Sequence, residues 1–275
     1  MARDMDTPSL TSEITSLAAY KGVIVVGWIA LLLIAERVAP AVARPRDPDS
    51  GRLGTWARIG RNFTLFAING VLSRVAVIPL TLAAATSPWG WRPEDLSLGG
   101  TGWAMMAVDL VILDIWIYWW HRANHRIPLL WRFHEVHHLD EFLDVSSAVR
   151  FHAGEVLLSA GVRAVVIIAL DIPLTTVLVF ETLVLVSSVF HHSNVKLPQG
   201  VERALARVIV TPSIHWVHHH AVRRDTDSNY ATVLSVWDRL FGSRSATPRT
   251  PEMTIGTEGR REKPLLGLLR RPFRD

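Results

Sequence analysis

Apolar residues in this chain are gathered into blocks separated by polar segments. Residues 16–35, 63–86 and 101–120 each form a block of about 20 residues or more, the length that a helix needs to cross a bilayer. A fourth block, residues 156–190, is interrupted by Asp171-Ile172-Pro173 into halves of about 15 and about 18 residues. The pattern predicts an all-α integral membrane protein in which the fourth block is a helical hairpin that enters the membrane and returns.

The first apolar block has two interpretations. The small residues at positions 41–43 (Ala-Val-Ala) are typical of a signal-peptide cleavage site. However, the residues that precede the block carry more acidic than basic side chains, whereas a signal peptide begins with a positive charge. We therefore expect a retained helix.

The basic residues predict an orientation. The loop 36–62 holds six arginines, whereas the turn-rich loop 87–100 holds only Arg92. Because cytoplasmic loops carry the excess of Lys and Arg, we expect the N-terminus outside, and the loop 36–62, all histidines and the C-terminus in the cytosol of a bacterial inner membrane.

Composition narrows the chemistry. The chain has a net charge of +4, but its basic residues flank apolar blocks instead of forming one stripe with aromatic residues, which disfavours nucleic-acid binding. There is no cysteine, so a disulfide framework, an iron–sulfur cluster and a thiolate metal site are all excluded. Any metal must be held by nitrogen and oxygen.

All twelve histidines lie between His121 and His220. They form four clusters and a single His152: HRANH (121–125), HEVHH (134–138), HHSN (191–194) and HWVHHH (215–220). Helical residues three and four apart share a face, so three of these clusters can each present two or three imidazoles to one centre. Imidazole suits iron, copper and zinc, and eight or nine ligands are too many for one ion. We expect two ions, held in a cytosolic helical cap above the membrane helices. The surplus disfavours a single catalytic zinc but leaves a dinuclear one open.

The histidines are not equally strong candidates for metal ligands. His191 and His192 are adjacent and point about 100° apart on a helix, so only one of them is expected to be a ligand. His220 lies off the face shared by His215, His218 and His219, and the isolated His152 is a tentative ligand. Asp114 shares a helical stripe with His121 and His125, so it either orients a ligand imidazole or hydrogen-bonds to a neighbouring helix.

Further motifs surround the clusters. The chain reads DIWIYWWHRANH (114–125), WRFHEVHH (131–138), VRFHAGE (149–155), FHHSNVKLP (190–198), TPSIHWVHHH (211–220) and NYATVLSVWDRLFGS (229–243). Over roughly residues 105–243 this order resembles the fatty acid hydroxylase superfamily, which includes sterol desaturases, C-4 methylsterol oxidases and alkylglycerol monooxygenase. The first hundred residues resemble it only as generic membrane spans. We therefore divide the chain into N-terminal membrane helices (1–100), a catalytic domain (101–245) and a loosely ordered basic tail (246–275).

The resemblance implies a set of metal ligands: His121, His125, His134, His137, His138, His192, His215, His218 and His219. It prefers His192 to His191 because the family's single histidine precedes a small polar residue, as His192 precedes Ser193. Glu135, Glu155 and Asn229 are candidates for supporting these ligands. The chain departs from the family at three motifs: HPxE, NYG and FGT are here HAGE (152–155), NYA (229–231) and FGS (241–243).

By the same resemblance the protein uses two irons, dioxygen and external electrons to hydroxylate or desaturate an unactivated C–H bond of a lipid, with no catalytic residue beyond the metal ligands. Such a bond is beyond side-chain acid–base chemistry, so a redox metal is required. The chain lacks a GxGxxG fingerprint, so electrons are expected from a separate ferredoxin, cytochrome or reductase. The alternative is a membrane metal-binding or metal-transport protein, although no acidic or histidine relay runs through the spans. The sequence leaves the substrate open.

Overall fold

The structure, a computed structural model, describes residues 7–44, 55–87 and 102–274, with side chains from residue 21 onward. The expected turn-rich loop 87–100, apart from its first residue, and the centre of the loop 36–62 lie outside the described residues. The helices are α1 (Thr7–Val38), α2 (Thr55–Leu72), α3 (Ile78–Ala85), α4 (Gly102–Arg126), α5 (Pro128–His138), α6 (Ala153–Leu170), α7 (Leu174–His192), α8 (Gln199–Leu205), α9 (Pro212–His218), α10 (Arg223–Thr226), α11 (Val236–Leu240) and α12 (Leu265–Arg270). The described residues also form three short helical turns: η1 (Ser73–Val77), η3 (Val145–Val149) and η4 (Arg271–Phe273). Within these ranges there is no β-strand, only isolated bridges.

The expected all-α membrane fold is confirmed. Among the described residues, four helical segments are long and apolar enough to cross a bilayer: residues 55–85, α4, α6 and α7. Their outward faces carry large exposed apolar side chains such as Val75 and Val165, which are 69 % and 64 % exposed. Lipid tails, not water, suit such a surface. The long α1 is not among the four, but it packs along α7, where the Trp28 indole donates to the carbonyl of Val186 at 3.0 Å.

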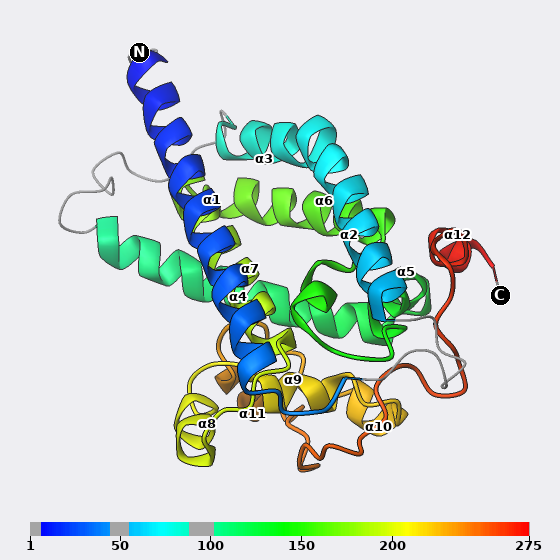
Figure 1. Cartoon of the computed structure of the whole chain (residues 1–275). Coiled ribbons are helices and arrows are strands. Elements are labelled where there is room, and N and C mark those ends of the chain that lie inside the picture. Colours follow the sequence, from blue (N-terminus) through cyan, green and yellow to red (C-terminus); the bar gives the residue numbers. More distant parts are fainter. Residues whose placement is uncertain (1–6, 45–54, 88–101, 275) are drawn as a thin grey trace.

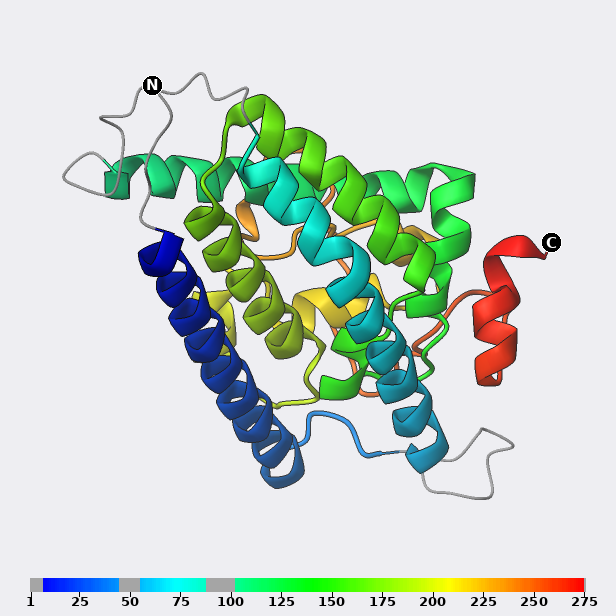
Figure 2. The ribbon, with the colours of Figure 1, turned by 90° about the horizontal axis from the view of Figure 1, so that it is seen from above.

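The predicted hairpin is α6 and α7. Asp171 ends α6 in the left-handed region at φ 50°, Ile172 is buried, and Pro173 precedes α7. Figure 2 shows α7 lying between α1 and the α2–α3 segment, and α3 packs against both arms of the hairpin. Before Pro79, the helix widens into the π-turn η1, because proline lacks the N–H that continues an α-helix.

Short helices α8 to α11 form a cap at the end of α7, at the bottom of Figure 1. The cap lies against α4: the Asp114 carboxylate accepts from the Trp237 indole at 2.7 Å and from the Leu234 N–H at 3.0 Å. Tyr118 of α4 packs with Tyr230 and Phe241 of the cap. These contacts hold the end of α4 that bears His121 and His125 beneath the cap.

The C-terminal segment differs from the loosely ordered tail that we expected. It runs back past the cap and places α12 against α2 and α5, where the fully buried Leu268 packs with Leu65 and Val136. Glu262 pairs with Arg150 at 2.8 Å and with Arg61. These few apolar and acidic residues are spread among many arginines and prolines, so composition alone did not reveal a packed segment.

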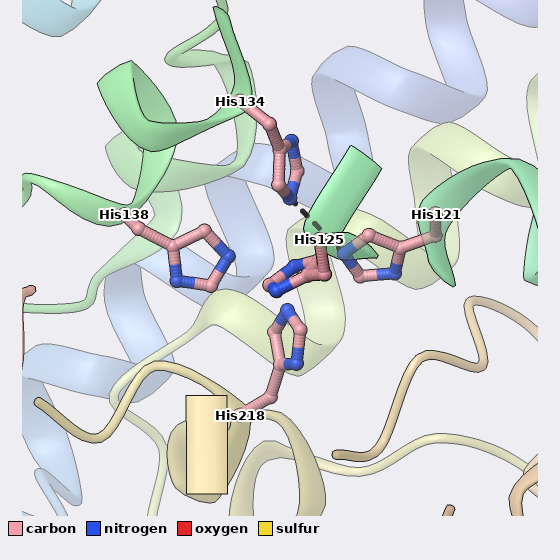
Figure 3. A group of neighbouring side chains, drawn as sticks. All are labelled: His121, His125, His134, His138 and His218. Carbon is pink, nitrogen blue, oxygen red and sulfur yellow. Dashed lines mark hydrogen bonds between the residues drawn. The ribbon is translucent and has the colours of Figure 1, made fainter. Parts of the chain in front are cut away.

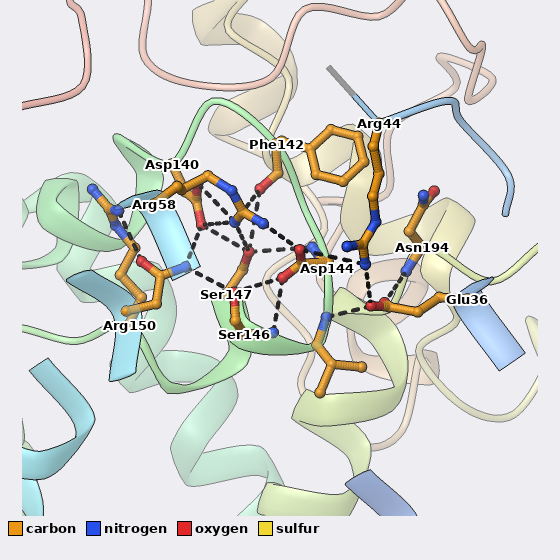
Figure 4. Close-up of polar contacts among 12 residues, drawn as sticks. Glu36, Arg44, Arg58, Asp140, Phe142, Asp144, Ser146, Ser147, Arg150 and Asn194 are labelled. Carbon is orange, nitrogen blue, oxygen red and sulfur yellow. Dashed lines mark hydrogen bonds and ion pairs between the residues drawn. The ribbon is translucent and has the colours of Figure 1, made fainter. Parts of the chain in front are cut away.

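A buried polar network joins the N-terminal helices to the segment after α5 (Figure 4). Arg58 of α2 pairs with Asp140 at 2.9 Å and with Asp144, and Asn62 donates to Asp140 at 3.0 Å. Burial alone would raise the pKa of Asp140, but the neighbouring Arg58 and Arg150 lower it below its ordinary value. The network therefore holds an ionised carboxylate directly after the HEVHH helix.

Candidate metal centre

The structure brings together nine histidines as two groups of potential metal ligands. The first group is His121, His125, His134, His138 and His218, and the second is His137, His192, His215 and His219. Within each group, one nitrogen of every ring lies within 4.8 Å of the others. These nine are the residues that the sequence analysis assigned as ligands.

Helix periodicity distributes the rings between the groups. On α5, His134 and His138 are four residues apart and face the first group, whereas His137 faces the second. On and just after α9, His215 and His219 face the second group and His218 the first. Figure 3 shows the first group converging from α4, α5 and α9. The two groups adjoin, since the rings of His138 and His219 stack with centroids 4.2 Å apart.

Five of the nine rings have an acceptor at Nδ1. Four acceptors are main-chain carbonyls, and the fifth is a carboxylate: Tyr230 O for His121 (2.7 Å), Arg150 O for His137 (3.1 Å), Ser188 O for His192 (2.7 Å), Ser228 O for His218 (2.6 Å) and Glu155 for His134 (2.7 Å). An acceptor at Nδ1 selects the tautomer with the proton there. In each of these rings Nε2 therefore carries the lone pair.

Those lone pairs face one another inside the protein. Nε2 of His121 lies 3.2 Å from Nε2 of His134, and Nε2 of His137 lies 3.0 Å from Nε2 of His192. Neither nitrogen in these pairs has a proton to share. Both nitrogens of His125 and of His138 are buried with no hydrogen-bond partner, although Nδ1 of His125 lies 3.5 Å from the carboxylate of Asp227. Converging unprotonated nitrogens in a dry interior fit a bound cation, and the donor set is all imidazole.

The rings outside the membrane-spanning helices favour the neutral form. Burial, followed by the neighbouring histidines, lowers the pKa of His137, His138, His215 and His219 well below its ordinary value. Burial and His121 do the same for His218. Neutral imidazole is the form that binds metal, so protons do not compete strongly for these sites near neutral pH.

The supporting candidates have different roles. Glu155 accepts from His134 and so contacts a ring of the first group. Glu135 points away from the rings and pairs with Arg271 at 2.5 Å and Arg260 at 3.0 Å, both in the C-terminal segment. Asp114 bonds to the cap as described above, which is the neighbouring-helix alternative. Only Glu155 of these three carboxylates orients a ring.

Asn229 contacts no ring itself, but it fixes the backbone that presents two carbonyls to the rings. It has a left-handed conformation, φ 52°, and its side chain donates to Ile214 O at 3.1 Å and accepts from the Ser245 N–H at 3.0 Å. The flanking carbonyls of Ser228 and Tyr230 then reach His218 and His121. Sequence reasoning missed these carbonyls because any residue has one. The signal available was an asparagine, which tolerates positive φ, before an aromatic residue.

Three histidines lie outside both groups. The tentative ligand His152 caps α6 instead: Nδ1 accepts from the Gly154 N–H at 2.9 Å, and Nε2 donates to Leu269 O at 3.1 Å. Both of its nitrogens are therefore used away from the groups. His220 bonds to Asp225 at 2.8 Å. His191 is buried beside His215, with ring centroids 4.0 Å apart, but belongs to neither group.

A cavity of about 470 Å³ leads to the histidines. It runs between α1, η1, α4, α6 and α7, and apolar side chains such as Ile117, Phe180 and Val184 make up most of its wall. His121, His134, His192 and His215 line one end, so both groups meet the cavity. An apolar cavity among membrane helices that ends at a polar cluster suits an alkyl chain.

Comparison with known proteins shows which family this chain resembles in sequence. A profile of the fatty acid hydroxylase family matches residues 106–243, which contain all nine grouped histidines. An ornithine lipid hydroxylase of Rhizobium tropici is 27 % identical over 91 % of this chain and 75 % of its own length. A cholesterol 25-hydroxylase-like protein of Danio rerio is 30 % identical over 69 % of this chain and 73 % of its own.

Human alkylglycerol monooxygenase is 31 % identical over 58 % of this chain, but the match spans only 32 % of that longer protein. No solved structure matches the chain significantly. The matched segment covers half of the chain and includes every ring of both groups, together with Glu155 and Asn229. The chain belongs to the fatty acid hydroxylase family.

Proposed function

We propose that the nine grouped histidines hold two iron ions and that the protein hydroxylates an unactivated C–H bond of a lipid with dioxygen and external electrons. The observation that carries this proposal is the convergence of unprotonated Nε2 atoms in two adjoining buried groups at the end of an apolar cavity. The named relatives are lipid hydroxylases and monooxygenases, which supports the same reaction class.

Iron suits the reaction better than zinc. An all-imidazole site accepts either metal, but zinc has no redox chemistry. When bound, the ions would supply the activation of dioxygen that no side chain can supply. The protein orients the rings through Nδ1, keeps water out by burying them, and directs an alkyl chain along the cavity toward both groups.

Electrons would come from a partner protein, because the chain has no cysteine for an iron–sulfur cluster and no nucleotide-binding glycine motif. Because arginines are concentrated in the loop 36–62, we also propose that the N-terminus lies outside and that the histidines and the C-terminus lie in the cytosol.

The first test is the metal content of the detergent-purified protein, with Mössbauer spectroscopy on protein from iron-57-grown cells. We expect about two irons per chain, spin-coupled when oxidised, and dioxygen consumption that requires both a reductant and lipid. A single ion, or zinc that persists after growth in iron-rich medium, would overturn the proposal. Metal uptake into vesicles without dioxygen consumption would establish the transport alternative.

A further inference from the structure

Three charged side chains line the cavity away from the histidines. Lys21 of α1 lies 3.0 Å from Glu181 of α7, and Arg163 of α6 lies 3.1 Å from the other oxygen of the same carboxylate. All three residues line the cavity, and their side chains are only 29 %, 24 % and 15 % exposed for Lys21, Glu181 and Arg163. Charged groups on membrane helices are costly and usually mark a functional site.

The position of this charged cluster (Lys21, Arg163 and Glu181) is fixed relative to the metal site. Glu181 and His192 are on the same helix, eleven residues apart, which is about 16 Å at 1.5 Å per residue. Both residues line the same cavity. A ligand that reached both ends would therefore have a polar group at one end and the reacting C–H bond at the other.

The charged cluster has more donors than acceptors. An ammonium has three N–H donors and a guanidinium five, whereas Glu181 is one carboxylate, which accepts from Lys21 and forms an ion pair with Arg163. The Nε atom of Arg163 is buried and has no hydrogen-bond partner. Of the other described residues that line the cavity, only Glu155 is acidic, and it is bonded to His134 at the opposite end. The charged cluster therefore carries a net charge of about +1, with no counter-ion among the described residues that line the cavity.

A purely structural role explains less. An ion pair that only joined helices would need one cation for one carboxylate, and burying a second cation costs free energy unless it is paired. The charged cluster also faces the cavity instead of a closed helix contact. Its unmatched charge and free donors fit an anion with several oxygen acceptors.

We propose that Lys21 and Arg163, held in place by Glu181, bind an anionic oxygen group, a carboxylate or a phosphate, of the lipid that occupies the cavity. The role of that lipid as substrate rests on the proposed function, but its binding does not. Because the charged cluster is anchored on three helices, it determines which lipids enter and the distance between the anionic group and the oxidised carbon.

Binding is measurable without turnover, because Trp116 and Trp120 also line the cavity. Quenching of tryptophan fluorescence would be followed in non-ionic detergent at about pH 8, where carboxylates are ionised. The probes are a brominated long-chain fatty acid, its methyl ester and the corresponding brominated monoalkyl phosphate. We expect the wild-type protein to bind an anionic probe about tenfold more tightly than the ester. A preference for only the acid or only the phosphate identifies the anion, whereas equal binding of all three probes overturns the proposal.

Variants separate recognition from folding. Lys21→Gln and Arg163→Gln are expected to lose the preference for the anionic probe while keeping the affinity for the ester. Arg163→Lys and Glu181→Gln retain the positive charge and should keep the preference. Arg61→Gln, which alters an ion pair with Glu262 outside the cavity lining, is the matched control.

An unchanged preference in both Lys21→Gln and Arg163→Gln would overturn the assignment, as would a loss in Glu181→Gln alone. If Arg163→Gln fails to elute as a monodisperse protein, the comparison of Lys21→Gln with the wild-type protein still decides. A failure of the proposed function appears differently, as missing iron or missing dioxygen consumption in a protein that still distinguishes acid from ester.

Discussion

At the scale of single residues, the centre depends on hydrogen bonds that are made behind the rings. Main-chain carbonyls fix His121, His137, His192 and His218 with the proton on Nδ1, and Glu155 does the same for His134. A carbonyl cannot be removed by changing its own side chain. The grouped rings are therefore robust to many neighbouring substitutions but sensitive to changes of backbone conformation.

Replacing a ring should remove metal. We expect His137→Ala and His218→Ala, one from each group, to bind fewer ions per chain and to lose activity, because each leaves a gap in a buried imidazole set. Elemental analysis and dioxygen consumption measure both effects. His220→Ala is the control, because that ring bonds to Asp225 and lies outside both groups. Loss of metal in the His220 variant would contradict the ligand assignment.

Glu155 offers a graded test. Glu155→Ala removes the acceptor for His134 Nδ1 and should weaken metal binding about 10- to 100-fold. Glu155→Gln keeps an oxygen acceptor without the charge and should weaken it less. Competition with a chelator gives both affinities, and equal losses in the two variants would show that the hydrogen bond is not the reason.

At the scale of elements, the C-terminal segment braces the helix that serves both groups. Leu268 packs on Leu65, Val136 and Leu139, and Arg271 pairs with Glu135 on the face of α5 opposite the histidines. The C-terminal segment therefore packs on the side of α5 that faces away from the rings. A displacement of α5 would move rings of both groups together.

A matched pair of substitutions tests this brace. Leu268 is fully buried and Leu266 is 56 % exposed, two residues away on the same helix. Leu268→Ala should lower the free energy of unfolding by about 2–5 kcal/mol, whereas Leu266→Ala should change it by less than about 0.5 kcal/mol. Thermal unfolding followed by fluorescence compares them, and equal effects would mean that α12 does not stabilise the fold.

The elements also show which features of the fold could be predicted from the sequence. Apolar blocks predicted the spans and the Asp171 break of the hairpin, and histidine spacing predicted which rings share a helical face, because periodicity and length are local properties. The full set of nine rings came from the resemblance to the fatty acid hydroxylase superfamily. The brace by α12 and the carbonyls of Ser228 and Tyr230 escaped prediction, because they depend on contacts between distant segments. His152 escaped for a related reason: only the fold shows that both of its nitrogens are used in capping.

At the scale of the whole molecule, the buried rings link stability to pH. The pKa values of His137, His138, His215, His218 and His219 are lowered in the folded protein, so below about pH 6.5 the unfolded chain takes up protons that the folded chain refuses. Stability without metal is therefore full above that pH and is lost as the pH falls.

We expect the unfolding temperature of the metal-free protein to fall steeply from about pH 7 to about pH 5, since each such group contributes up to about 1.4 kcal/mol per pH unit. Metal-loaded protein should resist acid further, because bound metal keeps the rings unprotonated. Unfolding temperatures of both forms across this range provide the measurement, and a flat profile for the metal-free protein would refute the linkage.

The division of the rings between two groups also implies an order of assembly during synthesis. The first group takes four of its five rings from residues 121–138, which leave the ribosome together. The second has only His137 by then and must wait for His192, His215 and His219. A growing chain therefore offers most of the first group before the hairpin is made, whereas the second group, and the fifth ring of the first, appear only with α9.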